Sequence, residues 1–305
     1  MKSLFRAVSA LVAVCFALLL ASFTTVVVKK VFLHGDGVGK AHVAVLDLNG
    51  IILGADSTLR DLKKLLKDHS VKALVVRINS PGGLVAPSQE IYEALKRADQ
   101  KIPVLISMQS LAASGGYYAA LGGRKIYADP GTFTASIGVI MEFVNSQKLY
   151  EWAKVDRFDL KAGKFKDAGS SYRPMTTEEK ELFQTILNDV AVQFKRTVKE
   201  RRKITDAELD QFADGRVMTG QQAYSAKLID ALGGFEDVVA EAKKIAQLPE
   251  SAEVVFPESK GGLLRQLLLG EESESSYPGP LQTLSQQLLP GFSPGWRVVL
   301  LSPLR

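Results

Sequence analysis

Ser114 has the sequence context of a reactive serine. It lies in 109–118 (QSLAASGGYY), after an apolar run at 101–108 that predicts a buried strand and before an alanine-rich run at 117–121 that predicts a helix. A serine at such a junction stands beside the free N–H groups of the helix start, which can stabilise a developing oxyanion. The simpler interpretation is that Ser114 only caps the helix, so the choice depends on the groups that accompany it.

A serine nucleophile needs a base to accept its proton, and histidine is the usual one. The sequence holds His34, His42 and His69, all upstream of Ser114, and none lies beside an acidic motif that would orient it. Chain order alone does not exclude a Ser-His-Asp triad, which is defined by its geometry. Because no histidine has an orienting acidic motif beside it, a Ser-His-Asp triad is a weaker hypothesis than a different base.

A lysine is the alternative base when removal from water leaves its amine uncharged near neutral pH. Lys161, Lys164 and Lys166 cluster between a predicted strand and a predicted loop. Lys164 and Lys166 flank Phe165, so they share one side of any extended backbone. Spacing does not show which lysine enters a cleft, and a solvated basic loop is the competing interpretation.

The elements around these residues alternate between strands and helices. Apolar runs predict strands at 43–48, 73–78, 101–108, 125–128, 155–161 and 253–256, with an extended segment of small residues at 131–140. Helices are predicted at 57–68 (capped by Ser57 or Thr58), 87–98, 117–121, 145–153, 178–203 (capped by Thr176 or Thr177), 205–212, 216–227 and 235–246. This alternation predicts an α/β fold with a parallel sheet and crossover helices.

Composition excludes some classes of protein. A hydrophobic fraction of 46% with 23% charged residues indicates a folded globular chain rather than a disordered one. The net charge of +5 is spread through mixed-sign segments without a basic stripe, so no nucleic-acid partner is expected. The single cysteine, Cys15, permits no intrachain disulfide and no cysteine-based metal site.

The stretch 7–28 carries no charge and has basic residues on both sides. A run of this length is enough to cross a bilayer core of about 30 Å. It exceeds the about 7–15 apolar residues usual in a cleaved signal, so we predict a signal anchor at 1–30 that is retained. The expected plan continues with a glycine-rich linker (31–42), a main domain (43–256) and a tail (257–305) interrupted by Gly, Pro and Ser.

Several motifs together resemble those of the bacterial signal peptide peptidase A family. They are 77–83 (RINSPGG), 108–118 with its AASGGYY, 135–139 (ASIGV), 164–167 (KFKD), 214–223 (DGRVMTGQQA) and 228–234 (LIDALGG). The NSPGG motif alone is shared across a wider superfamily, but the ordered set is specific. The resemblance implies a membrane-anchored serine protease with the Clp-protease/crotonase-like fold, in its short single-repeat form.

The resemblance also implies roles for individual residues. It makes Ser114 the nucleophile, Lys166 the general base 52 residues later, and Ser136 a serine that hydrogen-bonds and orients the lysine amine. The function expected is therefore hydrolysis of peptide bonds by a Ser/Lys dyad, through an acyl-enzyme.

Glycines complete the implied site. Gly82 or Gly83, together with the Gly115 amide, would form the oxyanion hole, because a missing side chain lets backbone N–H groups approach the substrate. The resemblance implies no metal and no cofactor. It implies signal peptides and other extended apolar peptides as substrates, and a homo-oligomer in which neighbouring subunits can complete each other's active sites. It also implies a single-pass protein of the inner (plasma) membrane with its main domain outside the cytoplasm.

Two other functions fit parts of the sequence. An acyl-CoA hydratase or isomerase of the same superfold would use the oxyanion hole with acidic groups, and an acidic residue at position 114 would favour it. A non-catalytic membrane scaffold would keep the fold, bind peptides and tolerate the loss of the Ser114 hydroxyl.

Overall fold

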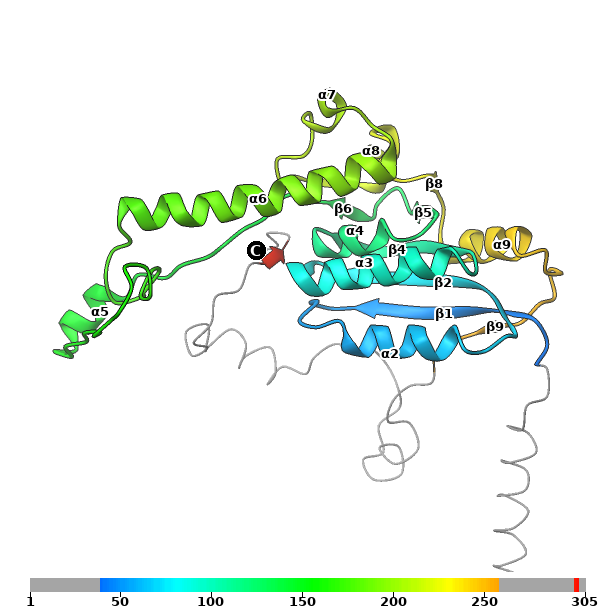
Figure 1. The fold of residues 1–305 in the computed structure, drawn as a ribbon. Coiled ribbons are helices and arrows are strands. Elements are labelled where there is room, and N and C mark those ends of the chain that lie inside the picture. Colours follow the sequence, from blue (N-terminus) through cyan, green and yellow to red (C-terminus); the bar gives the residue numbers. More distant parts are fainter. Residues whose placement is uncertain (1–38, 258–298, 302–305) are drawn as a thin grey trace, which may run out of the picture. The chain divides into compact units, whose positions relative to one another are not determined.

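The computed structural model of the protein describes residues 39–257 and 299–301 (Figure 1). The predicted anchor at 1–30 and nearly all of the predicted tail lie outside these residues. The chain divides into a unit Met1–Lys40 and a unit Ala41–Arg305, and the second is described below. In the part that the structure describes, no helix combines the length and the apolar character needed to cross a bilayer.

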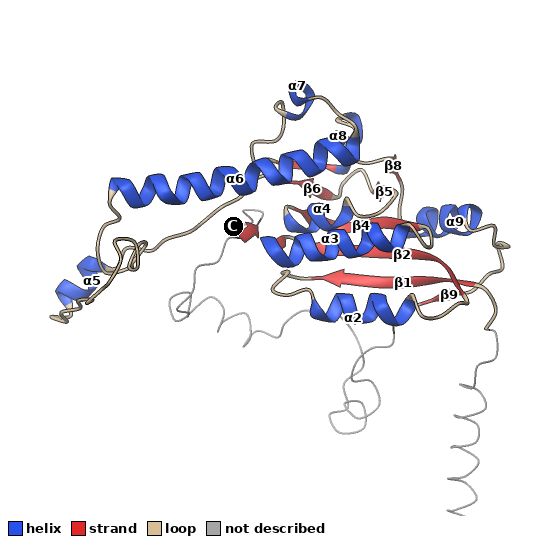
Figure 2. Ribbon diagram, in the orientation of Figure 1, coloured by secondary structure: helices blue, strands red, loops and turns tan. Residues whose placement is uncertain are grey.

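A mainly parallel sheet forms the centre of the described unit (Figure 2). Its main path runs β7-β6-β4-β2-β1-β9, and β5 pairs with both β4 and β8. Only the β6–β7 pairing within this sheet is antiparallel. The strands are β1 (His42–Asn49), β2 (Val71–Ser80), β4 (Val104–Ala113), β5 (Lys125–Ala128), β6 (Phe133–Ala135), β7 (Val217–Thr219), β8 (Ala231–Leu232) and β9 (Val254–Val255). The mixed α/β class and the parallel sheet are as predicted.

Helices cover both faces of the sheet because the central strands are apolar on both sides. Alternate residues of β1 and β2 point to opposite faces. Ala44 and Leu74 pack with the larger cluster, whereas Val43 and Ala73 pack with the smaller one beneath α9. The helices are α2 (Asp56–Leu65), α3 (Val85–Asp99), α4 (Gly115–Ala120), α5 (Gln147–Trp152), α6 (Thr177–Arg202), α7 (Asp206–Leu209), α8 (Gly220–Ser225) and α9 (Phe235–Ile245).

The long helix α6 has two different halves. Its C-terminal half packs on α4, where Phe194 and Val198 are fully buried and the Phe194 ring meets that of Tyr118 at 4.8 Å. Its N-terminal half extends beyond the sheet together with α5 and the segment between them (Figure 1). We call residues 140–176 the arm. No residue of α5 is buried, and Phe158 and Leu160 are 80% and 94% exposed.

Three local predictions were wrong. The stretch 155–161 forms no strand, because it has no neighbouring strand to pair with and its apolar side chains face outward. Residues 217–219, predicted to be helical, form β7 against β6, and the helix begins only after Thr219 caps it. Ser57 and Thr58 lie inside α2, whose N-cap position is Ala55. The Thr176 cap of α6 is confirmed, and it forms a reciprocal capping box with Glu179.

We expect the Phe194→Ala variant to lose about 3–5 kcal/mol of unfolding free energy, because it leaves a cavity between α6 and α4. Val192, two residues away on the same helix, is exposed. The matched Val192→Ala variant should change stability by no more than about 0.5 kcal/mol. Denaturant unfolding of the full chain in detergent measures both. Equal losses in the two variants would contradict this packing of α6.

Candidate active site

Ser114 sits at the turn from β4 into α4 in a strained backbone conformation. Its φ is +55° and its ψ is −115°, a region that residues other than glycine rarely occupy. Its N–H donates to the Ala135 carbonyl at 2.8 Å, which fixes the turn against β6. The side chain is buried, and its Oγ has no hydrogen-bond partner among the described residues. Ser114 occupies the N-cap position of α4 without capping it through its side chain, so the simple capping interpretation is wrong.

Ser136 lies beside this turn, at the end of β6. The register pairs Ala113 with Ala135, so the residues that follow, Ser114 and Ser136, leave the sheet side by side. Ser136 is buried with a φ of +52°, and its Oγ donates to the Gly215 carbonyl at 3.2 Å. The oxygen of Ser136 therefore keeps lone pairs with which it can accept a further N–H.

Glycines let three backbone segments meet at Ser114. A Cβ added to Gly115 would lie 2.5 Å from the Ser88 hydroxyl and 3.1 Å from the Gly83 nitrogen. A Cβ on Gly83 would lie 2.2 Å from the Ile52 carbonyl oxygen. Gly82 has a φ of +102°, and its N–H already donates to the Ser80 hydroxyl at 3.1 Å. The sequence left the oxyanion hole open between Gly82 and Gly83, and the Gly82 amide is the one that is already hydrogen-bonded.

A short strand of this glycine segment, β3 (Gly82–Leu84), pairs with a strand from the C-terminal region. That strand, β10 (Val299–Leu301), runs antiparallel to β3 and sets Leu300 opposite Gly83. The other side of β3 is bonded to Ile52, whose N–H donates to Gly82 and whose carbonyl accepts from Leu84. The edge of β3 next to the candidate oxyanion hole is thus suited to hold an extended peptide.

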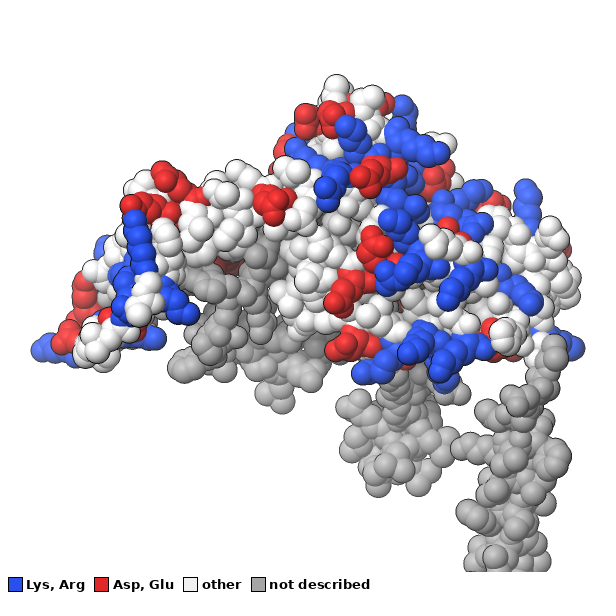
Figure 3. Space-filling model, in the orientation of Figure 1, with Lys and Arg blue, Asp and Glu red and all other residues white. Residues whose placement is uncertain are grey.

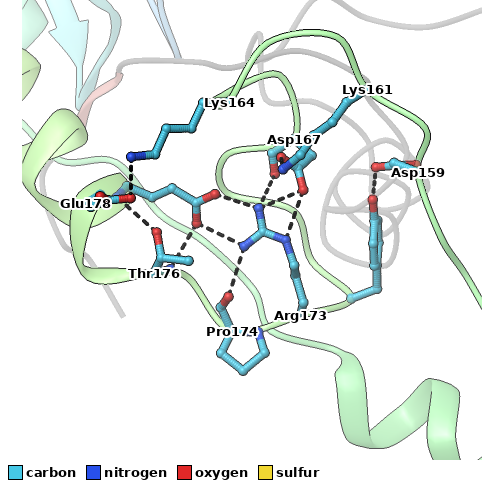
Figure 4. Close-up of polar contacts among 10 residues, drawn as sticks. Asp159, Lys161, Lys164, Asp167, Arg173, Pro174, Thr176 and Glu178 are labelled. Atoms are coloured by element: carbon cyan, nitrogen blue, oxygen red, sulfur yellow. Dashed lines mark hydrogen bonds and ion pairs between the residues drawn. The ribbon is translucent and has the colours of Figure 1, made fainter.

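The three clustered lysines have different surroundings. Lys161 donates to the Asp167 carboxylate, and Lys164 pairs with Glu178 at 2.7 Å (Figure 4). The Lys166 side chain is exposed, and the described part of the chain gives its amine no hydrogen bond or ion pair. Lys166 is therefore the one of the three that is free to reach another group. Within one chain, the described residues include no hydrogen bond between Lys166 and the Ser114 Oγ.

Two of the three histidines lie far from Ser114 in the fold. His42 begins β1 and His69 immediately precedes β2, so both are at the amino-terminal edge of the parallel strands. Ser114 follows the carboxyl end of β4, at the opposite edge. His34 lies outside the described residues. Neither described histidine can act as the base for Ser114 of the same chain.

An ionic cluster that the sequence did not reveal includes Asp167, the residue that follows Lys166 in the chain (Figure 4). Arg173 bridges the carboxylates of Asp167 and Glu179. Hydrogen bonds from Lys161 and Arg173 lower the pKa of Asp167 to about 2, and the hydrogen bond from Arg173 also lowers the pKa of Glu179. Lys161, the 164–167 motif and the predicted cap at Thr176 or Thr177 were sequence signals that touched this cluster, but none of them pointed to Arg173.

Some charged side chains elsewhere on the surface form ion pairs, among them Arg124–Asp99, Lys195–Asp210 and Lys199–Asp206. Both basic and acidic side chains are present on the face drawn in Figure 3.

Comparison with known proteins places this site in a family. The model of "Peptidase family S49" matches residues 96–249, which include Ser114, Ser136 and Lys166. The chain belongs to peptidase family S49. A putative protease of Synechocystis is 38% identical over 250 residues, covering 81% of this chain and 87% of that protein. The family is thus the one that the motifs indicated.

Two further relatives carry the name of signal peptide peptidase A. The putative signal peptide peptidase SppA of Enterococcus faecium is 28% identical over 84% of this chain and 78% of its own length. The chloroplastic serine protease SPPA of Arabidopsis thaliana is 33% identical over 70% of this chain, but the match spans only 32% of that longer protein. These names describe the relatives, and both are names of proteases.

Acid should loosen the loop that follows Lys166. The Asp167 pKa is lower in the folded protein than its value of about 3.9 in an unfolded chain. Its stabilising contribution is therefore complete above about pH 4 and is lost as the pH falls toward about 2. We expect pepsin cleavage at Phe165 in the full chain to accelerate over this interval. Asp167→Asn should already be cleaved quickly at pH 4, and identical pH dependence in both proteins would contradict the prediction.

Proposed function

We propose that this protein is a serine endopeptidase that hydrolyses extended apolar peptides by a Ser114–Lys166 dyad. The observation that carries the proposal is the buried, unpartnered Oγ of Ser114 among the described residues, held in a strained conformation at the start of α4. A structural serine in such a place would satisfy its hydroxyl within the fold. A nucleophile must instead leave it available to a base and to a substrate carbonyl. Membership of a peptidase family supports the same function.

The reaction begins when the neutral Lys166 amine takes the Ser114 proton as Oγ attacks the peptide carbonyl. The tetrahedral intermediate collapses, the C–N bond breaks, and the leaving amine receives the proton from the Lys166 ammonium. Water then gives a proton to Lys166 while it attacks the acyl-enzyme, and that proton returns to Ser114 as the acid product leaves. Ser136 would accept an N–H from the lysine amine while its own hydroxyl donates to Gly215.

The oxyanion would be bound by the amides of Gly83 and Gly115. The Gly82 amide is engaged by Ser80, which leaves Gly83 as the glycine of β3 for this role. A substrate strand that displaces β10 would run antiparallel to β3, at the edge where β10 pairs. This arrangement would place an extended backbone beside Ser114. A folded domain offers no such backbone, so we expect it to be a poor substrate.

The dyad would be completed between subunits of a homo-oligomer. Lys166 lies on the arm, where it is exposed and makes no hydrogen bond to the Ser114 Oγ of its own chain. The arm also exposes the large apolar side chains Trp152, Phe158 and Leu160, which a stable soluble surface rarely leaves uncovered together. A second copy of the chain would cover this surface, bury the lysine amine and thereby keep it neutral.

The substrate class and the location follow from the resemblance to signal peptide peptidase A. We propose that the substrates are signal peptides and other apolar segments, and that the predicted anchor at 1–30 holds the domain at the outer side of the plasma membrane in a single pass. On the same resemblance, we propose that the α/β fold has the Clp-protease/crotonase-like topology. We also propose that the reaction uses no metal and no cofactor.

We expect Ser114→Ala and Lys166→Ala each to lower hydrolysis of an apolar fluorogenic peptide by at least about 10³-fold, because the two groups act as one unit. Lys164→Ala is the matched control, and its rate should stay within about threefold of wild type, because Lys164 pairs with Glu178. The assay uses the full chain in detergent. A fully active Ser114→Ala variant would favour the peptide-binding scaffold, and loss of activity only in Lys164→Ala would move the base to Lys164.

Mixing the two inactive variants tests whether subunits share a site. A Ser114→Ala subunit still carries Lys166, and a Lys166→Ala subunit still carries Ser114. If the dyad forms between chains, assembly from equal amounts restores about a quarter of wild-type activity, since each site needs one competent group from each neighbour. A dyad within one chain would give no recovery after the variants are unfolded and assembled together.

A further inference from the structure

Two contacts join the loop that carries Lys166 to α6: the Lys164–Glu178 ion pair and the guanidinium of Arg173 (Figure 4). Arg173 donates from Nε and Nη2 to Oδ2 of Asp167, at 3.0 and 2.8 Å. It donates from Nη1 and Nη2 to the two carboxylate oxygens of Glu179, at 3.0 and 2.5 Å. The carbonyls of Asp167 and Pro174 also accept from it, each at 3.1 Å. All three nitrogens are engaged, so the plane of the guanidinium is fixed.

Glu179 is the fixed end of this bridge. Its side chain is only 4% exposed, and it also accepts the Thr176 N–H at 2.9 Å within the capping box of α6. The same helix is buried against α4 through Phe194. Glu179 is therefore a rigid anchor, because its carboxylate is buried and its helix is packed against α4 at the other end. Most of the arm has no such packing.

Asp167 is the end of the bridge next to Lys166. Both its carboxylate and its backbone carbonyl accept from Arg173, so the bridge fixes the residue whose peptide bond adjoins Lys166. Lys161 also donates to the Asp167 carboxylate. The two cations, Lys161 and Arg173, balance the two anions, Asp167 and Glu179, while Lys164 and Glu178 form a separate pair beside them.

This balance has a consequence for the neighbouring lysine. A carboxylate without a cation beside Lys166 would attract its ammonium form and oppose its use as a base. Lys161 engages Oδ1 of Asp167 and Arg173 engages Oδ2, so the second oxygen is kept from the lysine amine by Arg173.

We propose that Arg173 is a positioning residue for Lys166: by joining Asp167 to the buried Glu179, it fixes the backbone that bears the lysine and keeps the Asp167 carboxylate from pairing with the lysine amine. This inference rests on the proposed function, in which Lys166 is the base. Arg173 itself touches neither the substrate nor Ser114, and acts only through its neighbours.

The test compares Arg173→Met with Arg202→Met in the full chain in detergent, on the same apolar fluorogenic peptide. Arg202 is a matched control, because it forms a comparable forked pair with Asp230 at the far end of α6. We expect Arg173→Met to lower kcat at least about tenfold, with KM changed less than about twofold, because only the base is misplaced. Arg202→Met should leave kcat unchanged even if it lowers stability.

The pH profile separates positioning from a general loss of stability. Activity should rise with pH, since only the neutral amine accepts a proton, and Arg173→Met frees an oxygen of Asp167 that favours the ammonium. The rising limb should therefore move to higher pH by about one unit. Arg173→Met combined with Asp167→Asn should return the limb to its wild-type position. Arg173→Lys keeps the positive charge but loses the forked N–H donors of the guanidinium. We therefore expect it to leave the rising limb of the pH profile in place while it lowers kcat.

The outcomes distinguish this inference from the function on which it rests. If Ser114→Ala and Lys166→Ala are inactive but Arg173→Met retains the wild-type kcat and pH limb, the role of Arg173 is refuted and the dyad stands. If Arg202→Met reduces kcat as much as Arg173→Met does, the effect is one of stability and the inference fails. If Ser114→Ala remains active, the dyad and the inference fail together. If Arg173→Met does not fold, the Arg173→Lys variant decides by the same two readouts.

Discussion

The site depends on the close approach of three backbone segments at the carboxyl edge of the sheet. The turn that bears Ser114 is bonded to the end of β6 and packed against β3, at distances that leave no room for side chains at Gly83 and Gly115. The positive φ of Ser114 is held by this packing and not by its own preference. Parallel strands with helices on both faces make the approach possible, because they bring the ends of β2, β4 and β6 to one place.

The two halves of the candidate site are held by different physical forces. Ser114 and Ser136 are fixed by a buried apolar core and by backbone hydrogen bonds, which are insensitive to salt. Lys166 lies on an arm with few buried side chains, where an ionic cluster around Arg173 replaces the missing core. Ser114 thus belongs to the buried core of the described residues, whereas Lys166 belongs to a loop that is held mainly by charged side chains.

The sequence predicted the central fold well, because the fold has local signals, whereas Ser114 as the nucleophile stays a prediction. Long apolar runs identified β1, β2 and β4, and the Ser114-Gly115-Gly116 turn follows directly from the strand before it. Short elements at the edge were harder. Residues 217–219 form a strand only because β6 lies beside them, and 155–161 lacks the neighbour that its alternating pattern would need.

The Arg173 cluster escaped prediction for a related reason. Asp167, Arg173 and Glu179 are each six residues from the next, a spacing that does not place them on one face of a helix, and 167–176 forms no strand. Their contacts arise from how the loop folds onto the start of α6, which the sequence pattern does not encode. Lys166 as the base stays a prediction from the family's motif. What the structure adds is that Lys161 and Lys164 are paired with carboxylates.

Because β10 pairs with β3, any peptide that adds to that edge of β3 must compete with a strand of the same chain. Val299–Leu301 is tethered to the strand it meets, so its local concentration is set by the length of the intervening chain and not by how much protein is present. Diluting the protein does not release the edge, whereas a rise in the amount of any incoming chain that adds to β3 does. The tethered strand therefore raises the concentration of an incoming peptide that is needed to fill half of these edges.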